Sequence, residues 1–159
     1  MRNRNPTIYF DMDGTIADLY GVEGWLPMLQ NHNPKPYKLA RPLVDMRVFA
    51  RLLNILHDEG YRIGIISWLA KGSSPEYDKA VEDMKRTWIR THLHSVQFDE
   101  IHIVKYGTPK STIARPCSIL FDDEYNNRRE FVEADENNIA YDVGAIIRTI
   151  KDIIAQNNN

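Results

Sequence analysis

The chain has 159 residues, 43% of them hydrophobic and 26% charged, which is the size and composition of one soluble globular domain. Its 20 Lys and Arg residues against 22 Asp and Glu residues give a net charge of -2, which excludes an overall basic field that would draw it onto nucleic acid or anionic lipid. We therefore expect a single domain over residues 1–159, without strong general binding of nucleic acid.

The first predicted element is a strand over residues 8–10, and a segment rich in helix breakers follows it at residues 18–41. Five residues of that segment exclude one long helix: Gly21, Gly24, Pro27, Pro34 and Pro36. Its apolar side chains, among them Tyr20 and Trp25, are too frequent for disorder. We expect a small, partly ordered cap inserted after the first strand. The alternative is a structural Ω-loop with a small core of its own.

Helices and strands alternate after this insertion. Apolar residues at three- and four-residue steps between 43 and 56 predict a helix that ends before Gly60. The apolar run 63–66 predicts a strand. The Ser-Pro pair at 74–75 suits the cap and first turn of a second helix, whose apolar residues recur from Tyr77 to Trp88.

The remaining predicted elements are strands and short helices. Strands are expected at 101–104, 119–121 and 139–141, and helices at 127–134 and 145–155. Most of the five strand runs do not alternate with polar residues, which is typical of strands covered on both faces. Strands that alternate with helices predict βαβ units. The sequence therefore predicts an α/β fold with a five-stranded parallel sheet and helices on both faces.

Polar groups follow three of the apolar runs. Asp11-Met12-Asp13-Gly14-Thr15 follows the first, Ser67-Trp68 the second, and Asp122-Asp123 the fourth. The carboxyl ends of parallel strands lie along one edge of the sheet, so we expect these groups to converge there. Four carboxylates a few Å apart repel one another unless a cation is present. Oxygen ligands that share the ion with a phosphate are typical of Mg²⁺, which is therefore the predicted cofactor.

The segment Asp11-Met12-Asp13-Gly14-Thr15 resembles the first motif of the haloacid dehalogenase (HAD) superfamily of aspartyl-phosphate phosphatases. Ser67 is similar to its second motif, and Asp122-Asp123 resembles the fourth, metal-binding motif. The third motif is a lysine, which Lys110 matches best and for which Lys105 competes. The likeness spans about residues 7–145 and implies a Rossmann-like parallel sheet.

This resemblance implies a role for each motif residue. Asp11 would be the nucleophile and Asp13 the acid and then the base, while Ser67 and Lys110 would bind the transferring phosphoryl group. Mg²⁺ would be held by Asp11, by Asp13 through its backbone carbonyl, and by Asp122, with Asp123 nearby or acting through water. The residue types suit this route, because a carboxylate can attack phosphorus and a second one can protonate the leaving oxygen. Gly14 and Thr15 are expected to contact the substrate.

The substrate is predicted from the insertion and from a closer resemblance. Lys35, Lys38 and Arg41 make the insertion locally positive, which suits a phosphorylated substrate. Trp25 and Trp68 are candidates for stacking on a base. Four stretches resemble the 5'(3')-deoxyribonucleotidase branch of the superfamily: Ser74-Pro75-Glu76-Tyr77, Lys85-Arg86-Thr87-Trp88-Ile89, Gln97-Phe98 and 119–123. A small substrate, a nucleoside 5'-monophosphate, is therefore the main expectation.

Two other functions remain open. The insertion is about half the length expected for the cap of that branch, and an open sheet edge suits a phosphatase of polynucleotide ends or phosphoproteins. A non-catalytic, phosphate-binding regulatory relative is the alternative of another class. A complete set of motif residues argues against it: Asp11, Asp13, Ser67, Lys110 and Asp122.

The compartment is predicted from cysteine content and hydrophobic runs. Cys117 is the only cysteine, which excludes an internal disulfide, and no secretory leader pattern follows Met1. The longest apolar runs are far shorter than the roughly 20 residues that a membrane span needs. These features predict a cytoplasmic protein without a membrane anchor and leave its oligomeric state open.

Overall fold

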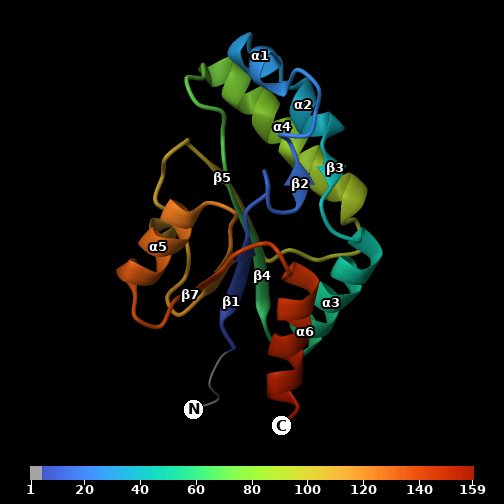
Figure 1. Ribbon diagram of the computed structural model, residues 1–159, viewed down its shortest axis with the longest axis vertical. Helices are drawn as coiled ribbons and strands as arrows, with labels where there is room; N and C mark the ends of the chain where they lie inside the picture. Colours follow the sequence, from blue (N-terminus) through green and yellow to red (C-terminus); the bar gives the residue numbers. More distant parts are fainter. Residues whose placement is uncertain (1–4) are drawn as a thin grey trace.

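The structure is a computed structural model that describes residues 5–159. Its centre is a parallel sheet of five strands in the order β5-β4-β1-β6-β7 (Figure 1). The strands are β1 (Thr7–Phe10), β4 (Arg62–Trp68), β5 (Glu100–Val104), β6 (Ile119–Phe121) and β7 (Ile139–Tyr141). Each of the five predicted apolar runs forms one of these strands, so the structure confirms the predicted sheet.

The central strand β1 is buried along its whole length because it pairs with β4 on one side and with β6 on the other. Tyr9 lies opposite Gly64 in this register. A Cβ atom at Gly64 would lie 2.7 Å from the Tyr9 ring, which is closer than two carbon atoms can approach. Glycine at this position therefore lets the Tyr9 ring lie across β4.

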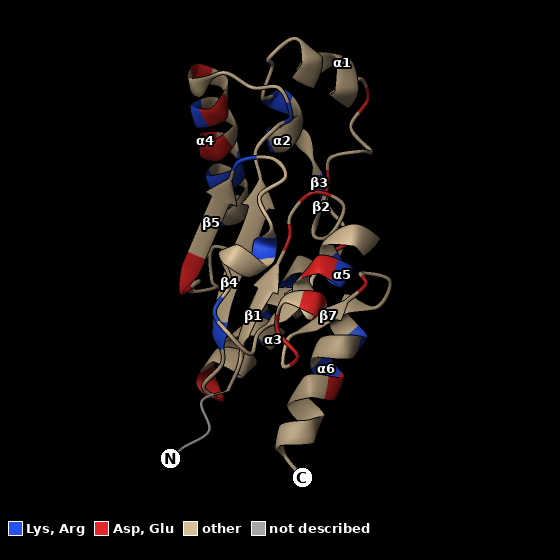
Figure 2. Ribbon diagram, turned by 90° about the vertical axis from the view of Figure 1, so that its left-hand side faces the viewer, with Lys and Arg blue, Asp and Glu red and all other residues tan. Residues whose placement is uncertain are grey.

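Helices cover both faces of the sheet, as the strand pattern predicts. The helices α3 (Met46–Asp58) and α6 (Ile146–Asn157) pack together on one face, and α5 (Tyr125–Ala134) covers the other with the 3₁₀ turn η1 (Lys110–Thr112). The long helix α4 (Pro75–His92) extends beyond the carboxyl ends of the strands (Figures 1 and 2). Among the residues that the structure describes, no helix is both long and apolar enough to cross a membrane.

Local signals explain where two of these helices begin. Asp45 caps α3, since its Oδ1 accepts hydrogen bonds from the backbone N–H groups of Arg47 and Val48. The helix therefore starts at Met46, and Leu43, which the pattern includes, lies exposed before it. Ser74 caps α4 through the N–H of Tyr77 at 3.3 Å, as its place before a proline predicts.

The segment between β1 and α3 forms a small cap over the carboxyl ends of the strands (Figure 1). Its stem is a pair of antiparallel strands, β2 (Ala17–Asp18) and β3 (Arg41–Pro42), and its body consists of α1 (Trp25–Gln30) and α2 (Lys35–Leu39). The segment predicted as a small, partly ordered cap thus contains two short helices. Leu19 and Tyr37 of the cap share an apolar cluster with Ala70, Tyr77 and Val81, which attaches the cap to α4.

Candidate active site

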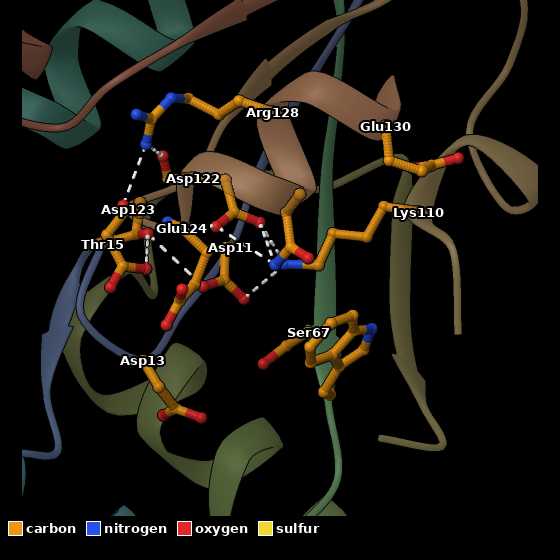
Figure 3. A network of polar contacts seen from close by, with 12 residues as sticks. Asp11, Asp13, Thr15, Ser67, Lys110, Asp122, Asp123, Glu124, Arg128 and Glu130 are labelled. Carbon is orange, nitrogen blue, oxygen red and sulfur yellow. Dashed lines mark hydrogen bonds and ion pairs between the residues drawn. The ribbon is translucent and has the colours of Figure 1, made fainter. Parts of the chain in front are cut away.

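Three parallel strands deliver polar side chains to one edge of the sheet, beneath the cap. Asp11 directly follows β1, Ser67 lies near the end of β4, and Asp122 and Asp123 directly follow β6 (Figure 3). β1 is the neighbour of both other strands, so residues that are far apart in the sequence meet around Asp11. This is the edge at which ligands bind in open α/β sheets.

Three of the four predicted carboxylates form a compact acidic group. Asp11, Asp122 and Asp123 each offer an oxygen, and these oxygens lie within 4.8 Å of one another. The Thr15 hydroxyl lies 3.4 Å from Asp11 Oδ2 and 3.3 Å from Asp123 Oδ1. Burial, together with the charges of Asp11 and Asp122, raises the pKa of Asp123 to about 7. A set of hard oxygen donors with this excess of negative charge is suited to a divalent cation.

Lys110 neutralises part of this charge. Its side chain is only 2% exposed, and its Nζ lies 2.9 Å from Asp11 Oδ1 and 2.5 Å from Asp122 Oδ2. Burial alone would lower the pKa of this ammonium group, but the two carboxylates outweigh burial and raise it. Lys105 is exposed just after β5. The structure therefore places Lys110, and not Lys105, beside the predicted nucleophile.

The loop after β6 is held by groups that the sequence analysis does not identify. Asp122 is fully buried, and its carboxylate accepts hydrogen bonds from the Glu124 N–H at 2.9 Å and from Asn127 Nδ2 at 3.2 Å. Arg128 donates to the backbone carbonyls of Asp122 and Asp123, each at 2.9 Å. Asn127 and Arg128 lie in the first turns of α5, which begins two residues after Asp123. The start of that helix thus orients the carboxylates.

Asp13 departs from the expected cluster of four carboxylates. Its side chain lies apart from the other three in Figure 3, and its Oδ2 lies 2.7 Å from the Nζ of Lys85. Burial and the charge of Asp11 raise the pKa of Asp13, against the opposing effect of Lys85. The site therefore contains three gathered carboxylates and a separate ion pair, because a buried ammonium group from α4 attracts the fourth carboxylate.

Lys85 is a further residue whose place in the site the sequence motifs did not predict, although it belongs to one of the stretches that resemble the deoxyribonucleotidase branch. It is 1% exposed although it is charged, and it also donates to Ser67 Oγ at 2.7 Å. A signal for it is present in the sequence, since Lys85 falls four residues after Val81 and three before Trp88, on the buried face of α4. A lysine within an apolar helical stripe indicates a buried partner.

Gly14 and Thr15 shape the loop after Asp11. Gly14 has a φ of 78°, and a Cβ atom there would lie 2.4 Å from an oxygen of Asp123. Only glycine fits both this left-handed conformation and this close approach. The Thr15 hydroxyl contacts Asp11 and Asp123, so both residues support the acidic group. Their predicted contact with substrate remains a prediction.

A cavity of about 610 Å³ lies above the acidic group, within the range of small-molecule sites. Asp11, Asp13, Lys110 and Asp123 line its base. Both tryptophans predicted to contact substrate line its walls. Trp25 packs edge to face on Tyr20, with ring centroids 5.0 Å apart. The indole N–H of Trp68 donates to the Thr108 carbonyl at 2.8 Å, and its ring centroid lies 5.0 Å from that of Tyr106.

Comparisons with known proteins identify the fold. No protein-family model matches the sequence, and a search of the curated proteins finds no relative. The structure is similar to D,D-heptose 1,7-bisphosphate phosphatase from Burkholderia thailandensis, with a TM-score of 0.59, 12% identity, and coverage of 95% of this chain and 99% of that one. The chain shares the fold of that phosphatase.

A second solved structure has a similar fold. D,D-heptose 1,7-bisphosphate phosphatase from B. bronchiseptica, complexed with magnesium and phosphate, matches with a TM-score of 0.53 and 12% identity, over 93% of this chain and 99% of that one. Identities this low establish a common fold and leave the substrate open. The predicted likeness to the deoxyribonucleotidase branch remains a prediction.

Proposed function

We propose that this chain is a Mg²⁺-dependent phosphomonoester hydrolase that forms an aspartyl-phosphate at Asp11, and that nucleoside 5'-monophosphates are its substrates. The observation that carries the proposal is the acidic group of Asp11, Asp122 and Asp123 beside the buried Lys110, at the base of a cavity with room for a small molecule. The shared fold supports the same assignment, since both solved structures are phosphatases by name.

The donor set of this chain fits Mg²⁺. Asp11, Asp122 and the backbone carbonyl of Asp13 would hold the ion, with Asp123 nearby or acting through water. All of these donors are oxygen, and the raised pKa of Asp122 and of Asp123, caused by burial and by the charge of Asp11, reflects negative charge that a cation would relieve. When bound, the ion would neutralise charge on the phosphoryl oxygens.

The reaction uses the two carboxylates in turn. A carboxylate oxygen of Asp11 attacks phosphorus, the bond to the leaving group breaks, and Asp13 gives its proton to the leaving oxygen. Asp13 then takes a proton from water, whose oxygen attacks phosphorus and releases Asp11 and inorganic phosphate. Lys110 and the Ser67 hydroxyl stabilise the charge on the transferring group.

The walls of the cavity support a nucleotide as the substrate. Aromatic rings line it from two sides, with Tyr20, Trp25 and Tyr37 from the cap, Trp68 from the end of β4 and Tyr106 from the loop after β5. A purine or pyrimidine ring can stack on such groups while the phosphate reaches the acidic base of the cavity. A sugar phosphate without a base would leave these rings without a flat partner.

The test is a screen of phosphate release with Mg²⁺. It compares nucleoside 5'-monophosphates with 3'-monophosphates, sugar phosphates and a sugar bisphosphate, a 5'-phosphorylated oligonucleotide and a phosphopeptide. We expect the highest kcat/KM on the nucleoside 5'-monophosphates, with no release by an Asp11→Asn variant purified in the same way. Preference for the oligonucleotide or the phosphopeptide would support an open-site phosphatase. Binding of phosphate without turnover of any compound would support a regulatory protein.

A further inference from the structure

We infer that Lys85 is a positioning residue that orients both Asp13 and Ser67 for the reaction, a role that rests on the function proposed above. Its Nζ lies 2.7 Å from each of three oxygens: Asp13 Oδ2, Ser67 Oγ and the backbone carbonyl of Trp68. These acceptors come from two segments, the loop after β1 and the end of β4. One buried ammonium group therefore joins the two segments that carry the acid–base residue and the hydroxyl.

The number of donors on an ammonium group determines how the Ser67 hydroxyl is used. A lysine has three N–H donors and no acceptor, and the three contacts of Lys85 employ all of them. Ser67 Oγ must therefore accept from Lys85, and its own hydrogen remains to be donated elsewhere. Within residues 5–159 this hydroxyl has no other hydrogen-bond partner. Lys85 thus leaves Ser67 with a free O–H for a phosphoryl oxygen.

The contact with Lys85 gives the two carboxylate oxygens of Asp13 different roles. Oδ2 accepts from Lys85, whereas Oδ1 has no hydrogen bond among the described residues. The side chain is 18% exposed and lines the cavity. Lys85 therefore fixes the carboxylate by one oxygen and leaves the other available to a leaving group or a water molecule, as an acid–base residue requires.

The surroundings of Lys85 hold its ammonium group in place. The ring of Tyr37, on the cap, lies 4.9 Å from Nζ, and the indole N–H of Trp88, one turn further along α4, donates to the Ala40 carbonyl at 2.8 Å. The cap and α4 together keep water from the ammonium group. In such a shielded site its hydrogen bonds are stronger and better defined than at the surface.

The site therefore has two buried lysines with different partners. Lys110 contacts Asp11 and Asp122, the nucleophile and a predicted metal ligand. Lys85 contacts Asp13 and Ser67. Loss of Lys85 should therefore affect the proton transfer to the leaving group more than the attack by Asp11.

The experiment measures how far catalysis depends on the leaving group. The full chain with Mg²⁺ is assayed on p-nitrophenyl phosphate, whose leaving group departs without a proton, and on phenyl phosphate, whose more basic leaving group needs one. General acid catalysis contributes about 10²–10⁴-fold. We expect Lys85→Met to lower kcat/KM on phenyl phosphate by about 100-fold and on p-nitrophenyl phosphate by less than about tenfold. When Asp13 is already Asn, Lys85→Met should lower kcat/KM on the two esters by the same factor.

The matched control is Lys79→Met, because Lys79 lies exposed on the same helix and, among residues 5–159, forms an ion pair with Asp83 alone. Its rates on both esters should stay within about twofold of the unsubstituted enzyme. Equal losses on the two esters in Lys85→Met would show that Lys85 does not act through Asp13 and would overturn the inference. If circular dichroism shows that Lys85→Met is unfolded, the same two assays are made with Lys85→Arg. Arginine keeps the charge but cannot direct three donors from one atom. We therefore expect Lys85→Arg to lose about tenfold more kcat/KM on phenyl phosphate than on p-nitrophenyl phosphate. Equal losses of kcat/KM on the two esters would overturn the inference.

The proposed function fails in a different way. An unsubstituted chain that hydrolyses neither ester with Mg²⁺ would refute the phosphatase assignment itself, and the role of Lys85 with it. An active chain whose Lys85 variants show no leaving-group preference would refute only the role of Lys85.

Discussion

The base of the cavity and its walls are built in different ways. At the base, Asp11 and Lys110 are almost completely buried and are bonded to each other and to neighbouring strand ends. In the walls, Tyr20 is 48% exposed and Tyr106 is 54% exposed, and both belong to segments outside the five-stranded sheet. The base is thus fixed by the core of the protein, whereas the walls belong mainly to the cap and to loops, with Trp68 at the end of β4.

This difference separates two kinds of selectivity. Charged groups held by buried hydrogen bonds are preorganised for one reaction, and they gain strength from their low-dielectric surroundings. Aromatic side chains on a cap offer contact area that can change without disturbing the sheet. We therefore expect substitutions at the base to reduce the rate on every substrate, and substitutions in the walls to change which substrate is preferred.

The largest effect is expected at Asp11, the proposed nucleophile. Asp11→Asn keeps the shape of the side chain, but an amide is a poor nucleophile and a weaker metal ligand. Loss of an acting nucleophile costs several powers of ten, about 10⁴-fold or more in kcat. The measurement is phosphate release from p-nitrophenyl phosphate and from a nucleotide, with circular dichroism as the control for folding. Activity close to that of the unsubstituted chain, after exclusion of contaminating phosphatases, would refute the assignment of Asp11.

Removal of the metal should abolish activity on all substrates alike. The acidic group of Asp11, Asp122 and Asp123 needs a hard cation, and the phosphoryl oxygens need its charge. Excess EDTA should stop turnover, and added Mg²⁺ should restore it, whereas Zn²⁺ should replace it poorly. The prediction would be wrong if activity were complete in EDTA while elemental analysis found no metal on the protein.

The next effect distinguishes the two candidate lysines of the third motif. Lys110→Ala removes the only ammonium group within bonding distance of both Asp11 and Asp122 among the described residues. Loss of one preorganised group of this kind typically costs about 10²–10³-fold in kcat. Lys105→Ala is the matched control and should change kcat by less than about twofold, because Lys105 is exposed. A greater loss for Lys105→Ala would move the motif lysine to that position.

Substitutions in the walls should change KM and not kcat. Stacking on a base is worth about 1–3 kcal/mol, so Trp25→Ala or Trp68→Ala should raise KM for a nucleotide roughly 5- to 150-fold. Hydrolysis of p-nitrophenyl phosphate, measured in parallel, should change little. Leu39→Ala is a control in the same cap, since Leu39 is 48% exposed and does not line the cavity. Equal losses on both substrates would show that the tryptophans support the catalytic loops.

The smallest effect concerns the stability of the metal-free protein. Burial and the charges of Asp11 and Asp122 raise the pKa of Asp123 from its ordinary value of 3.8 to about 7. Between these values the folded chain keeps a proton that the unfolded chain has released. Its free energy of unfolding therefore falls as pH rises from about 4 to about 7, and the whole penalty is present above pH 7.

Asp123→Asn tests this dependence, because the amide cannot ionise. Without metal, the variant should have a higher Tm than the unsubstituted chain at pH 8 and a similar Tm near pH 4. Added Mg²⁺ should reduce the difference at pH 8, since the cation offsets the charge that the variant lacks. A variant that is equally destabilised at both pH values would contradict the prediction.

Much of the fold was predictable from the sequence, because the relevant signals are local. Each apolar run marks a strand, and Asp45, Ser74 and Gly60 mark helix ends through hydrogen bonds or backbone conformation within a few residues. The convergence of Asp11 with Asp122 was also predictable, since the carboxyl ends of parallel strands share one edge.

The tertiary structure alone decided where the Asp13 carboxylate lies and what covers the site. Lys85 is 72 residues from Asp13 in the sequence. Its helical spacing predicts that it is buried but does not predict which residue it contacts. The attachment of the cap to α4 through Leu19 and Tyr37 is likewise a contact that no local pattern contains. Strand patterns and motif residues are local properties of the sequence, whereas the partner of a buried charge depends on which distant segments the fold brings together.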